Sequence, residues 1–121
     1  MPNGILDYRR GEIWWVDLNP AVGSETKKQR PCLIIQNDLG NEKSGTTIIA
    51  PLLKGNKNYP FVVNVKATAQ NKLDQDRYID LGQIRAIDSS RVKNRLGILE
   101  DTYWENIKIA VDIQLGFNVM F

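Results

Sequence analysis

The stretch GEIWWVDLNP (Gly11–Pro20) leads through the basic segment ETKKQRP (Glu25–Pro31) into CLIIQ (Cys32–Gln36), and this order decides the fold. The two outer runs are rich in Ile, Trp, Val and Leu, a composition that predicts β-strands over Gly11–Leu18, ended by Asn19-Pro20, and over Cys32–Gln36. The middle segment is polar, so we expect it to be the joining loop and to hold a carboxylate near a guanidinium. Arg30 directly precedes Pro31, which favours extended backbone at residue 30 and helps to aim the arginine side chain.

The rest of the chain predicts more short strands and one late helix. Strands are expected in four further runs: Thr46–Leu53, Phe61–Val65, Arg77–Ile84 and, more weakly, Val92–Leu99. A turn cluster occupies Asn37–Asn41, and Ala86–Ser90 is expected to hold a short helical turn. Thr102 and Glu105 form the capping-box pattern T-x-x-E, which predicts the start of a helix. Gly116 is a suitable C-cap and predicts the end of the same helix. The fold class is therefore α+β, a small curled sheet or barrel capped by a C-terminal helix.

Composition indicates one ordinary globular domain over residues 1–121, small enough to favour dimerisation. No apolar run is long enough to span a membrane. The first residues lack the charged start and apolar centre of a secretion signal.

The single cysteine, Cys32, lies in an apolar run and cannot form an internal disulfide. We expect it to be a buried core residue of a protein in the reducing cytoplasm.

The absence of histidine excludes several kinds of catalytic site. A two-histidine ribonuclease and the Ser-His and Cys-His triads all need an imidazole. With one cysteine and no histidine, we expect no metal site. The chain also has no Gly-rich phosphate loop and no dinucleotide-binding motif, so we expect no cofactor. Any chemistry depends on Arg, Lys, Glu, Asp, hydroxyl groups or the backbone.

The positive charges form two groups along a chain whose net charge is only +2. The first group is Arg9, Arg10, Lys27, Lys28 and Arg30, and the second is Arg91, Lys93 and Arg95. Such groups indicate either an anionic partner or a solvated charged surface, and the sequence leaves both interpretations open.

Several motifs in order resemble the MazF/PemK/Kid toxins, the toxin halves of bacterial toxin–antitoxin pairs. The motifs are RGEIWWVDLNP (10–20), GSE (23–25), RP (30–31), IQND (35–38), YPF (59–61) and LGQIRAID (81–88). The resemblance runs nearly end to end and is strongest to members of Gram-positive type. It implies an SH3-like β-barrel with a C-terminal helix, forming a homodimer.

The same resemblance implies a function. Members of this family are metal-independent, sequence-selective endoribonucleases that cleave single-stranded RNA such as mRNA, and the resemblance implies the same activity here. The ribose 2′-OH attacks the adjacent phosphate and leaves a 2′,3′-cyclic phosphate and a 5′-OH. A cognate antitoxin neutralises such a toxin, with an acidic disordered tail expected to fold over the RNA groove, and the toxin–antitoxin complex is expected to bind DNA.

The resemblance also assigns site residues. Arg30 matches the catalytic arginine, whose guanidinium fork suits two phosphoryl oxygens. Glu25 matches the acid of the Gly-Ser-Glu motif and is expected to orient Arg30, to contact the ribose or its 2′-OH, or simply to be solvated. Gln83 lies in the segment that the family places near the RNA groove. Its amide is expected either to read a base edge or to make a structural hydrogen bond. Further contacts to RNA are expected from Ser24, Lys27, Lys28 and Lys54, with Tyr59, Phe61 and Tyr78 as stacking or core residues.

Leu53 departs from the family pattern, which has a catalytic Thr or Ser at this position. Leucine cannot donate a hydrogen bond to phosphate. Lys54 would replace the hydroxyl only if a bulge turned it to the same face, because neighbours on a strand alternate. Thr46 or Thr47 would have to reach from earlier on the strand. Otherwise the chain is a catalytically impaired member that binds RNA or antitoxin. An unrelated SH3-like interaction domain is the remaining alternative.

Overall fold

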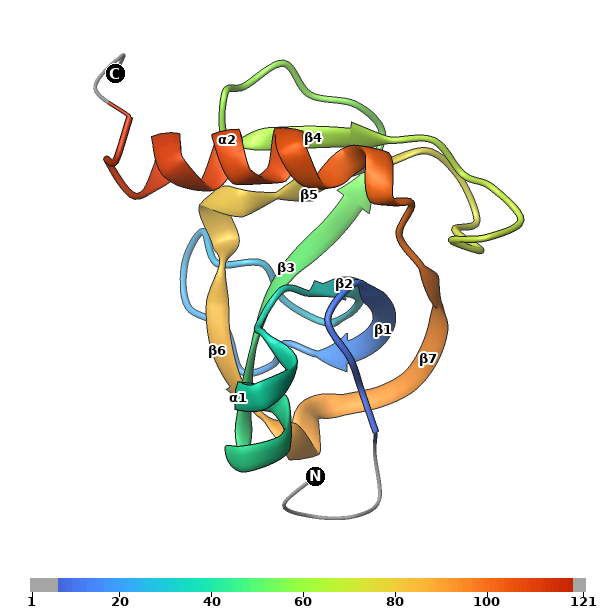
Figure 1. Cartoon of the computed structure of the whole chain (residues 1–121), viewed down its shortest axis with the longest axis vertical. Helices are drawn as coiled ribbons and strands as arrows, with labels where there is room; N and C mark the ends of the chain where they lie inside the picture. Colours follow the sequence, from blue (N-terminus) through green and yellow to red (C-terminus); the bar gives the residue numbers. More distant parts are fainter. Residues whose placement is uncertain (1–6, 119–121) are drawn as a thin grey trace.

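The computed structural model describes residues 7–118, and Figure 1 shows their arrangement. The strands in this part of the chain are β1 Glu12–Asp17, β2 Gln29–Ile34, β3 Thr46–Lys54, β4 Val62–Val65, β5 Arg77–Asp80, β6 Arg85–Asp88 and β7 Val92–Ile98. The helices are α1 Asp38–Lys43 and α2 Trp104–Gln114, with 3₁₀ turns η1 Leu81–Gln83, η2 Ser89–Arg91 and η3 Asp101–Tyr103. The predicted α+β class is confirmed.

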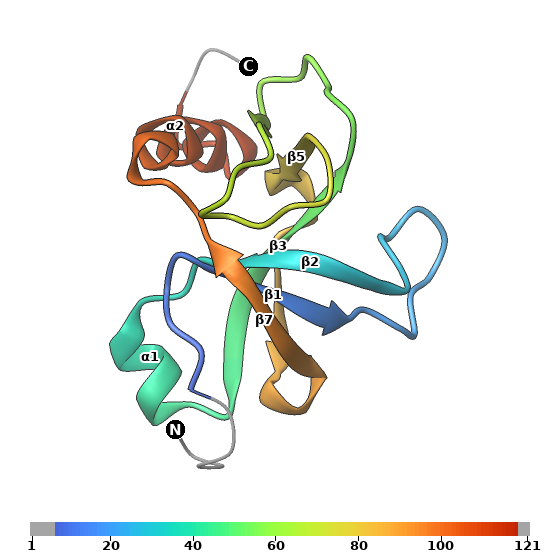
Figure 2. The ribbon, with the colours of Figure 1, turned by 90° about the vertical axis from the view of Figure 1, so that its right-hand side faces the viewer.

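The strands pair antiparallel in the order β4-β5-β3-β2-β1-β7, and β6 pairs with β3. The long strand β3 holds β6 over Thr46–Ile49 and β5 over Leu52–Lys54, so the sheet bends along it. The end strands β4 and β7 form no ladder with each other within residues 7–118, and the sheet is curled but open (Figures 1 and 2). The expected curled antiparallel sheet with a C-terminal helix is therefore confirmed, without full closure into a barrel.

Two hydrophobic clusters occupy the two faces of the curled sheet. Along β1 and β2, the paired residues Ile13 and Leu33 belong to the cluster that also contains Ile107 of α2. The next pair, Trp14 and Cys32, belongs to the second cluster. This alternation is the period of two that strands impose. Cys32 is 0% exposed, which confirms the prediction that it is a core residue.

Helix α1 replaces the expected turn cluster at residues 37–41. The Asn37 side chain accepts a hydrogen bond from the Gly40 N–H at 2.8 Å, which caps the first turn. Asn41 is buried and accepts a hydrogen bond from the Thr47 hydroxyl at 2.7 Å. A six-residue helix held by polar contacts has too few apolar residues to show a helical period.

The strand expected over residues 77–84 ends early. The Asp80 carboxylate accepts a hydrogen bond from the Gly82 N–H at 2.9 Å and starts η1, so β5 and β6 are separate strands. The helical turn expected at residues 86–90 is displaced, because Ala86 to Asp88 belong to β6 and η2 follows at Ser89.

Helix α2 ends as expected but does not begin as expected. Thr102 lies inside η3, and no side chain caps α2, so the predicted capping box is wrong. The C-terminal prediction is confirmed, because Gly116 has φ 79° and donates its N–H to the Ile113 carbonyl at 3.1 Å.

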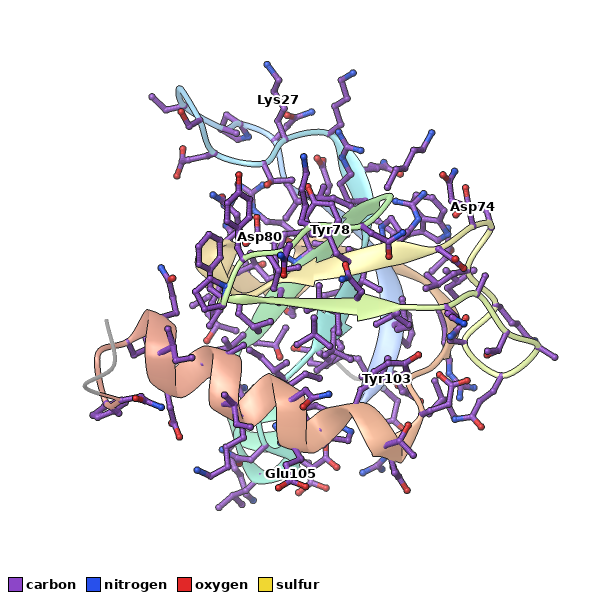
Figure 3. All side chains as sticks on the ribbon, turned by 90° about the horizontal axis from the view of Figure 1, so that it is seen from above. Lys27, Asp74, Tyr78, Asp80, Tyr103 and Glu105 are labelled. Atoms are coloured by element: carbon purple, nitrogen blue, oxygen red, sulfur yellow. The ribbon has the colours of Figure 1, made fainter. Side chains whose placement is uncertain are left out.

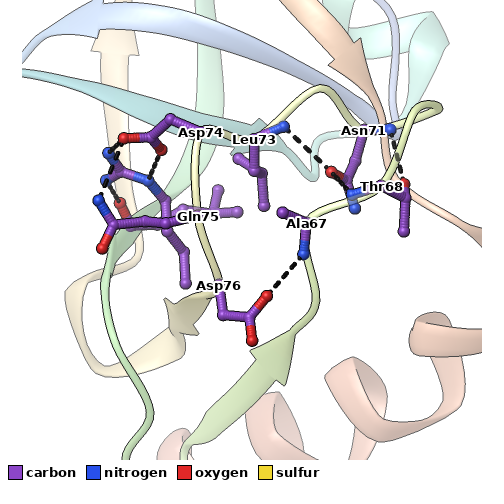
Figure 4. A network of polar contacts seen from close by, with 9 residues as sticks. Ala67, Thr68, Asn71, Leu73, Asp74, Gln75 and Asp76 are labelled. Atoms are coloured by element: carbon purple, nitrogen blue, oxygen red, sulfur yellow. Dashed lines mark hydrogen bonds and ion pairs between the residues drawn. The ribbon is translucent and has the colours of Figure 1, made fainter.

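The polar segment between β4 and β5 is ordered by side-chain hydrogen bonds to backbone (Figure 4). Asn71 Oδ1 accepts from the N–H groups of Thr68 and Leu73 at 3.0 and 3.1 Å. Asp74 forms an ion pair with Arg77 at 2.9 Å, and the Arg77 side chain is only 4% exposed. These contacts hold the start of β5 in place.

Candidate functional site

Arg30, Leu53 and Tyr78 stand on three neighbouring strands, β2, β3 and β5, and form a row of positions on one face of the sheet. The β2–β3 ladder ends at the pair Cys32 and Pro51, and Arg30 and Leu53 each lie two residues beyond it on their strands. On the other edge of β3, Leu53 lies opposite Tyr78 of β5. Because directly opposed residues point to the same face of a sheet, these three side chains share the face turned away from α2.

Arg30 lies on a strand and not in the loop that the sequence predicts. It pairs with Val16 of β1, is half-buried, and donates a hydrogen bond from Nε to the Lys27 carbonyl at 3.2 Å. Burial raises the pKa of the Cys32 thiol, while the charges of Arg85 and Arg30 act against this rise. Two guanidinium groups therefore lie near the same end of β2.

Glu25 folds back on its own loop. Its Oε1 accepts from the Val22 N–H at 2.6 Å, and its own N–H donates to the Val22 carbonyl at 3.1 Å. Within residues 7–118 no ion pair joins Glu25 to Arg30. No ion pair therefore supports the expected orienting of Arg30 by Glu25, and that role stays a prediction. The exposed carboxylate is also compatible with a ribose contact or with solvation.

The β1–β2 loop presents its basic side chains to solvent. The Leu18 N–H donates to the Lys28 carbonyl at 3.0 Å, and the Lys28 N–H donates to Asn19 Oδ1 at 3.0 Å. Lys28 has φ 72°, an uncommon conformation for a residue with a side chain. Ser24, Lys27 and Lys28 are exposed on this loop, which projects on the side away from α2 (Figure 2).

Gln83 connects η1 to the basic loop. Its Oε1 accepts a hydrogen bond from the Thr26 N–H at 3.2 Å, so the structural hydrogen bond considered for it is present. The Gln83 amide N–H₂ makes no hydrogen bond within residues 7–118 and remains a free donor. The structural role of Gln83 is therefore present, and base reading by the amide N–H₂ group stays a prediction.

The groups expected to replace the missing hydroxyl lie elsewhere. The β3–β5 register is regular through Lys54 and Arg77, so no bulge turns Lys54 to the face of Leu53. Thr47 is fully buried and hydrogen-bonded inside the protein. Thr46 lies at the opposite end of β3, beside β6.

Two aromatic rings stack beside η1. Tyr59 and Phe61 lie with ring centroids 5.3 Å apart and an interplanar angle of 3°. The Phe61 carbonyl accepts the Leu81 N–H at 3.0 Å, which places this pair next to the segment that carries Gln83. Tyr59 is 56% exposed, so it belongs to the rim and not to the core.

Asp80 is a site neighbour that the sequence reasoning missed. Figure 3 shows Tyr78 and Asp80 between the strands and the loop of Lys27, on the side away from Glu105 of α2. Burial raises the pKa of the Asp80 carboxyl, against the hydrogen bond from the Gly82 N–H. The signal available in the sequence was Asp-Leu-Gly, a pattern that starts a turn.

The candidate site is an open surface and not an enclosed pocket. A hollow of about 620 Å³ lies against α2 and is lined by Arg10, Trp104 and Val111 among others. A second, of about 390 Å³, lies beside Tyr59 and Ile109. Neither contains Arg30 or Gln83, and an open face suits an extended polymer better than a small molecule.

Within residues 7–118, acidic and cysteine side chains form no group of the size that a metal ion needs. In the same part of the chain, no helix is long and apolar enough to span a membrane.

Comparison with known sequences extends over nearly the whole chain. The chain is 40% identical over 111 residues to endoribonuclease MazF of Staphylococcus epidermidis, covering 91% of this chain and 92% of that protein. It is also 40% identical over 114 residues to endoribonuclease MazF of Staphylococcus saprophyticus, covering 93% and 94%.

Solved structures share the fold at lower identity. An endoribonuclease in complex with its cognate antitoxin from a mycobacterial species has a TM-score of 0.75 at 19% identity, covering 93% of this chain and 98% of that one. MazF from Deinococcus radiodurans has a TM-score of 0.74 at 24% identity, covering 91% and 99%. Residues 9–115 match the family described as "PemK-like, MazF-like toxin of type II toxin-antitoxin system". The chain therefore belongs to the PemK-like, MazF-like toxin family.

Proposed function

We propose that this protein is an endoribonuclease toxin that cleaves single-stranded RNA without a metal ion. The observation that carries the proposal is the position of Arg30, half-buried on β2 at the base of an exposed basic loop. Relatives at 40% identity over nearly their full length are endoribonucleases, which supports the same activity here.

The proposed reaction is attack by the ribose 2′-OH on the adjacent phosphorus. The 2′-oxygen–phosphorus bond forms, the phosphorus–5′-oxygen bond breaks, and the 5′-oxygen takes up a proton as the 2′-OH loses one. Negative charge builds up on the two free phosphoryl oxygens. The planar guanidinium of Arg30 presents paired donors to them, on a rigid strand that needs little rearrangement. The products are a 2′,3′-cyclic phosphate and a 5′-OH.

RNA binding is assigned to the groups around this arginine. Lys27 and Lys28 on the β1–β2 loop are exposed and bind phosphates by counterion release. Lys54 is exposed at the end of β3 on the opposite face from Leu53, and it binds a phosphate further along the RNA strand. Ser24, exposed on the same loop, adds a hydroxyl. Gln83 has a free amide donor for a base edge. Together these groups form a sequence-selective track for a single strand.

Two protein partners belong to the proposal. A cognate antitoxin fits the basic face, since an acidic tail would compete with RNA for the same lysines, and one structural neighbour is itself an antitoxin complex. A second copy of the chain fits the end of α2, where Ile109, Leu115 and Phe117 are 47%, 58% and 77% exposed. Exposed apolar residues of this size favour association.

A second candidate function is that of an impaired family member that binds RNA or antitoxin without cleaving. Leu53 favours it, because leucine has neither donor nor acceptor to offer phosphate. Binding would survive such a change, since the basic loop does not depend on Leu53.

The test is cleavage of a long mixed-sequence RNA by the purified protein in EDTA, with cut sites and end groups mapped. Reproducible cuts that leave cyclic phosphate are expected from the wild type, and Arg30→Ala should slow them by about 10²–10³-fold without unfolding the protein. Unchanged cutting by Arg30→Ala would overturn the site assignment. No cutting by wild type, together with retained RNA binding, would favour the impaired member.

A further inference from the structure

We propose that Tyr78 donates the hydrogen bond to the scissile phosphate that Leu53 cannot donate. The inference rests on the proposed endoribonuclease function and names a further catalytic residue for it. Its starting point is the strand register, since Tyr78 on β5 lies directly opposite Leu53 on β3.

Position favours Tyr78 over any other hydroxyl near the site. Leu52 and Ile79, the next pair in the same ladder, are both 0% exposed and belong to the core cluster under α2. Leu53 and Tyr78 therefore point to the opposite face, which is the face of Arg30. Neighbouring strands are about 4.8 Å apart. A phosphate above Leu53 would meet the phenol of Tyr78 across the β3–β5 pair, and the guanidinium of Arg30 from β2, the strand on the other side of β3.

The hydroxyl of Tyr78 is free to act. The residue is half-buried, so its ring is supported while its edge can reach solvent. Within residues 7–118 its hydroxyl makes no hydrogen bond. The hydroxyl of Tyr103 differs, because it accepts the Lys66 N–H at 3.3 Å on the helix side of the molecule.

The chemistry suits a phenol above an apolar neighbour. The phenolic hydroxyl of tyrosine is a hydrogen-bond donor. Leu53 removes water from beneath the phosphate, and a hydrogen bond to charge is stronger where water is excluded. Tyr78 keeps its proton throughout, so the bonds made and broken at phosphorus are those already described. Leu53 and Tyr78 together take the place of one hydroxyl side chain.

The experiment compares Tyr78→Phe, Tyr103→Phe and the double variant Leu53→Thr/Tyr78→Phe with wild type. Each is assayed in EDTA on an RNA oligonucleotide spanning a mapped cut site. Binding is measured with the same oligonucleotide carrying a 2′-deoxyribose at that site, which cannot be cleaved. Thermal melts verify that each variant is folded.

Tyr78→Phe is expected to cut about 10²-fold more slowly, the effect of losing one preorganised donor, with affinity for the deoxy oligonucleotide changed only a few-fold. Tyr103→Phe should cut as wild type does, and the double variant should recover much of the rate. Cutting by folded Tyr78→Phe at the wild-type rate overturns this inference alone. A loss of affinity equal to the loss of rate also overturns it. Wild type that does not cut overturns the proposed function, and this inference with it.

Discussion

Gln83 and Thr26, separated by 57 positions in the chain, are joined by a hydrogen bond of 3.2 Å from the Thr26 N–H to Gln83 Oε1. The bond attaches the tip of the basic loop to η1, a turn that is itself fixed by Asp80. The segment proposed to read a base and the loop proposed to bind phosphate are therefore held together by one side chain.

Two substitutions at Gln83 separate its two roles. Gln83→Glu keeps an acceptor for the Thr26 N–H but loses the amide donors, so we expect the loop to stay in place and the cut-site preference to change. Gln83→Leu loses both, so we expect faster hydrogen exchange at the Thr26 amide as well. Exchange measured by NMR and mapped cut sites test this. Equal exchange at Thr26 in all three proteins would contradict the structural role.

Arg30→Lys separates the shape of the guanidinium from its charge. Lysine keeps the charge but offers a point donor instead of a planar fork. We expect it to regain little of the about 10²–10³-fold rate lost in Arg30→Ala, while the salt dependence of RNA binding stays the same. Lys27→Ala is the matched control, and it should lower the log–log salt slope by about 0.7 with a smaller effect on rate. Wild-type cleavage by Arg30→Lys would show that charge alone suffices.

Asp74 makes the stability of the protein depend on acid pH. Its hydrogen bond to Arg77 lowers the pKa of the carboxyl from 3.8 to about 2. A lowered carboxyl pKa stabilises the folded state above pH 3.8, and this contribution is lost as pH falls through about 2. We expect Asp74→Asn to lower the free energy of unfolding at pH 7, and the difference from wild type to shrink towards pH 2.

Urea unfolding at pH 7, 4 and 2 measures this difference. Asp112→Asn is the control, since the partner of Asp112 in its ion pair, Lys108, is 77% exposed and the pair should contribute less than about 1 kcal/mol. A difference between Asp74→Asn and wild type that does not vary with pH would contradict the assignment.

Gly97→Ala should destabilise the fold by steric overlap. A Cβ at Gly97 would lie 2.3 Å from the carbonyl oxygen of Asn71. The Asn71 side chain holds this residue in place, because its Nδ2 donates to the Lys66 carbonyl and to Glu100 Oε1. We expect a loss of about 1–3 kcal/mol in the free energy of unfolding. Gly45→Ala is the control, because its Cβ would meet nothing within 4 Å. Equal stabilities of the two variants in urea would show that the loop around Asn71 moves aside at no cost.

Ile109→Glu tests the proposed self-association through α2. A carboxylate on this exposed apolar face should lower the molar mass measured by sedimentation equilibrium, since charge is costly to bury. Leu39→Glu places the same change on α1, at the other end of the molecule from α2 (Figure 1), where no effect is expected. Dissociation by Leu39→Glu alone would move the interface to α1.

The sequence is a good guide to elements that bury apolar runs. Strands β1, β2 and β3 are rich in Ile, Leu, Trp and Val, so composition alone predicts them. Helix α1 and the break at Asp80 are governed instead by side-chain hydrogen bonds, from Asn37 and Asp80 to nearby backbone. Such bonds compete with regular structure and leave only weak patterns in a single sequence.

The candidate site shows the same limit. Arg30, Ser24 and the lysines could be proposed from a motif, since they are close together in the chain. The relation of Leu53 to Tyr78 depends on the register between β3 and β5. Register cannot be predicted from the sequence unless it is known which strands pair. The return of Glu25 to Val22 likewise depends on the conformation of one loop.

The row formed by Arg30, Leu53 and Tyr78 has a consequence for how such a nuclease evolves. The three residues stand on the neighbouring strands β2, β3 and β5, so their positions depend on the sheet more than on the loops at its rim. The β1–β2 and β3–β4 loops can change in length and composition while the proposed reacting geometry persists. Changes in these loops alone could then alter which RNA sequence is cut, while the three residues on the strands stay the same.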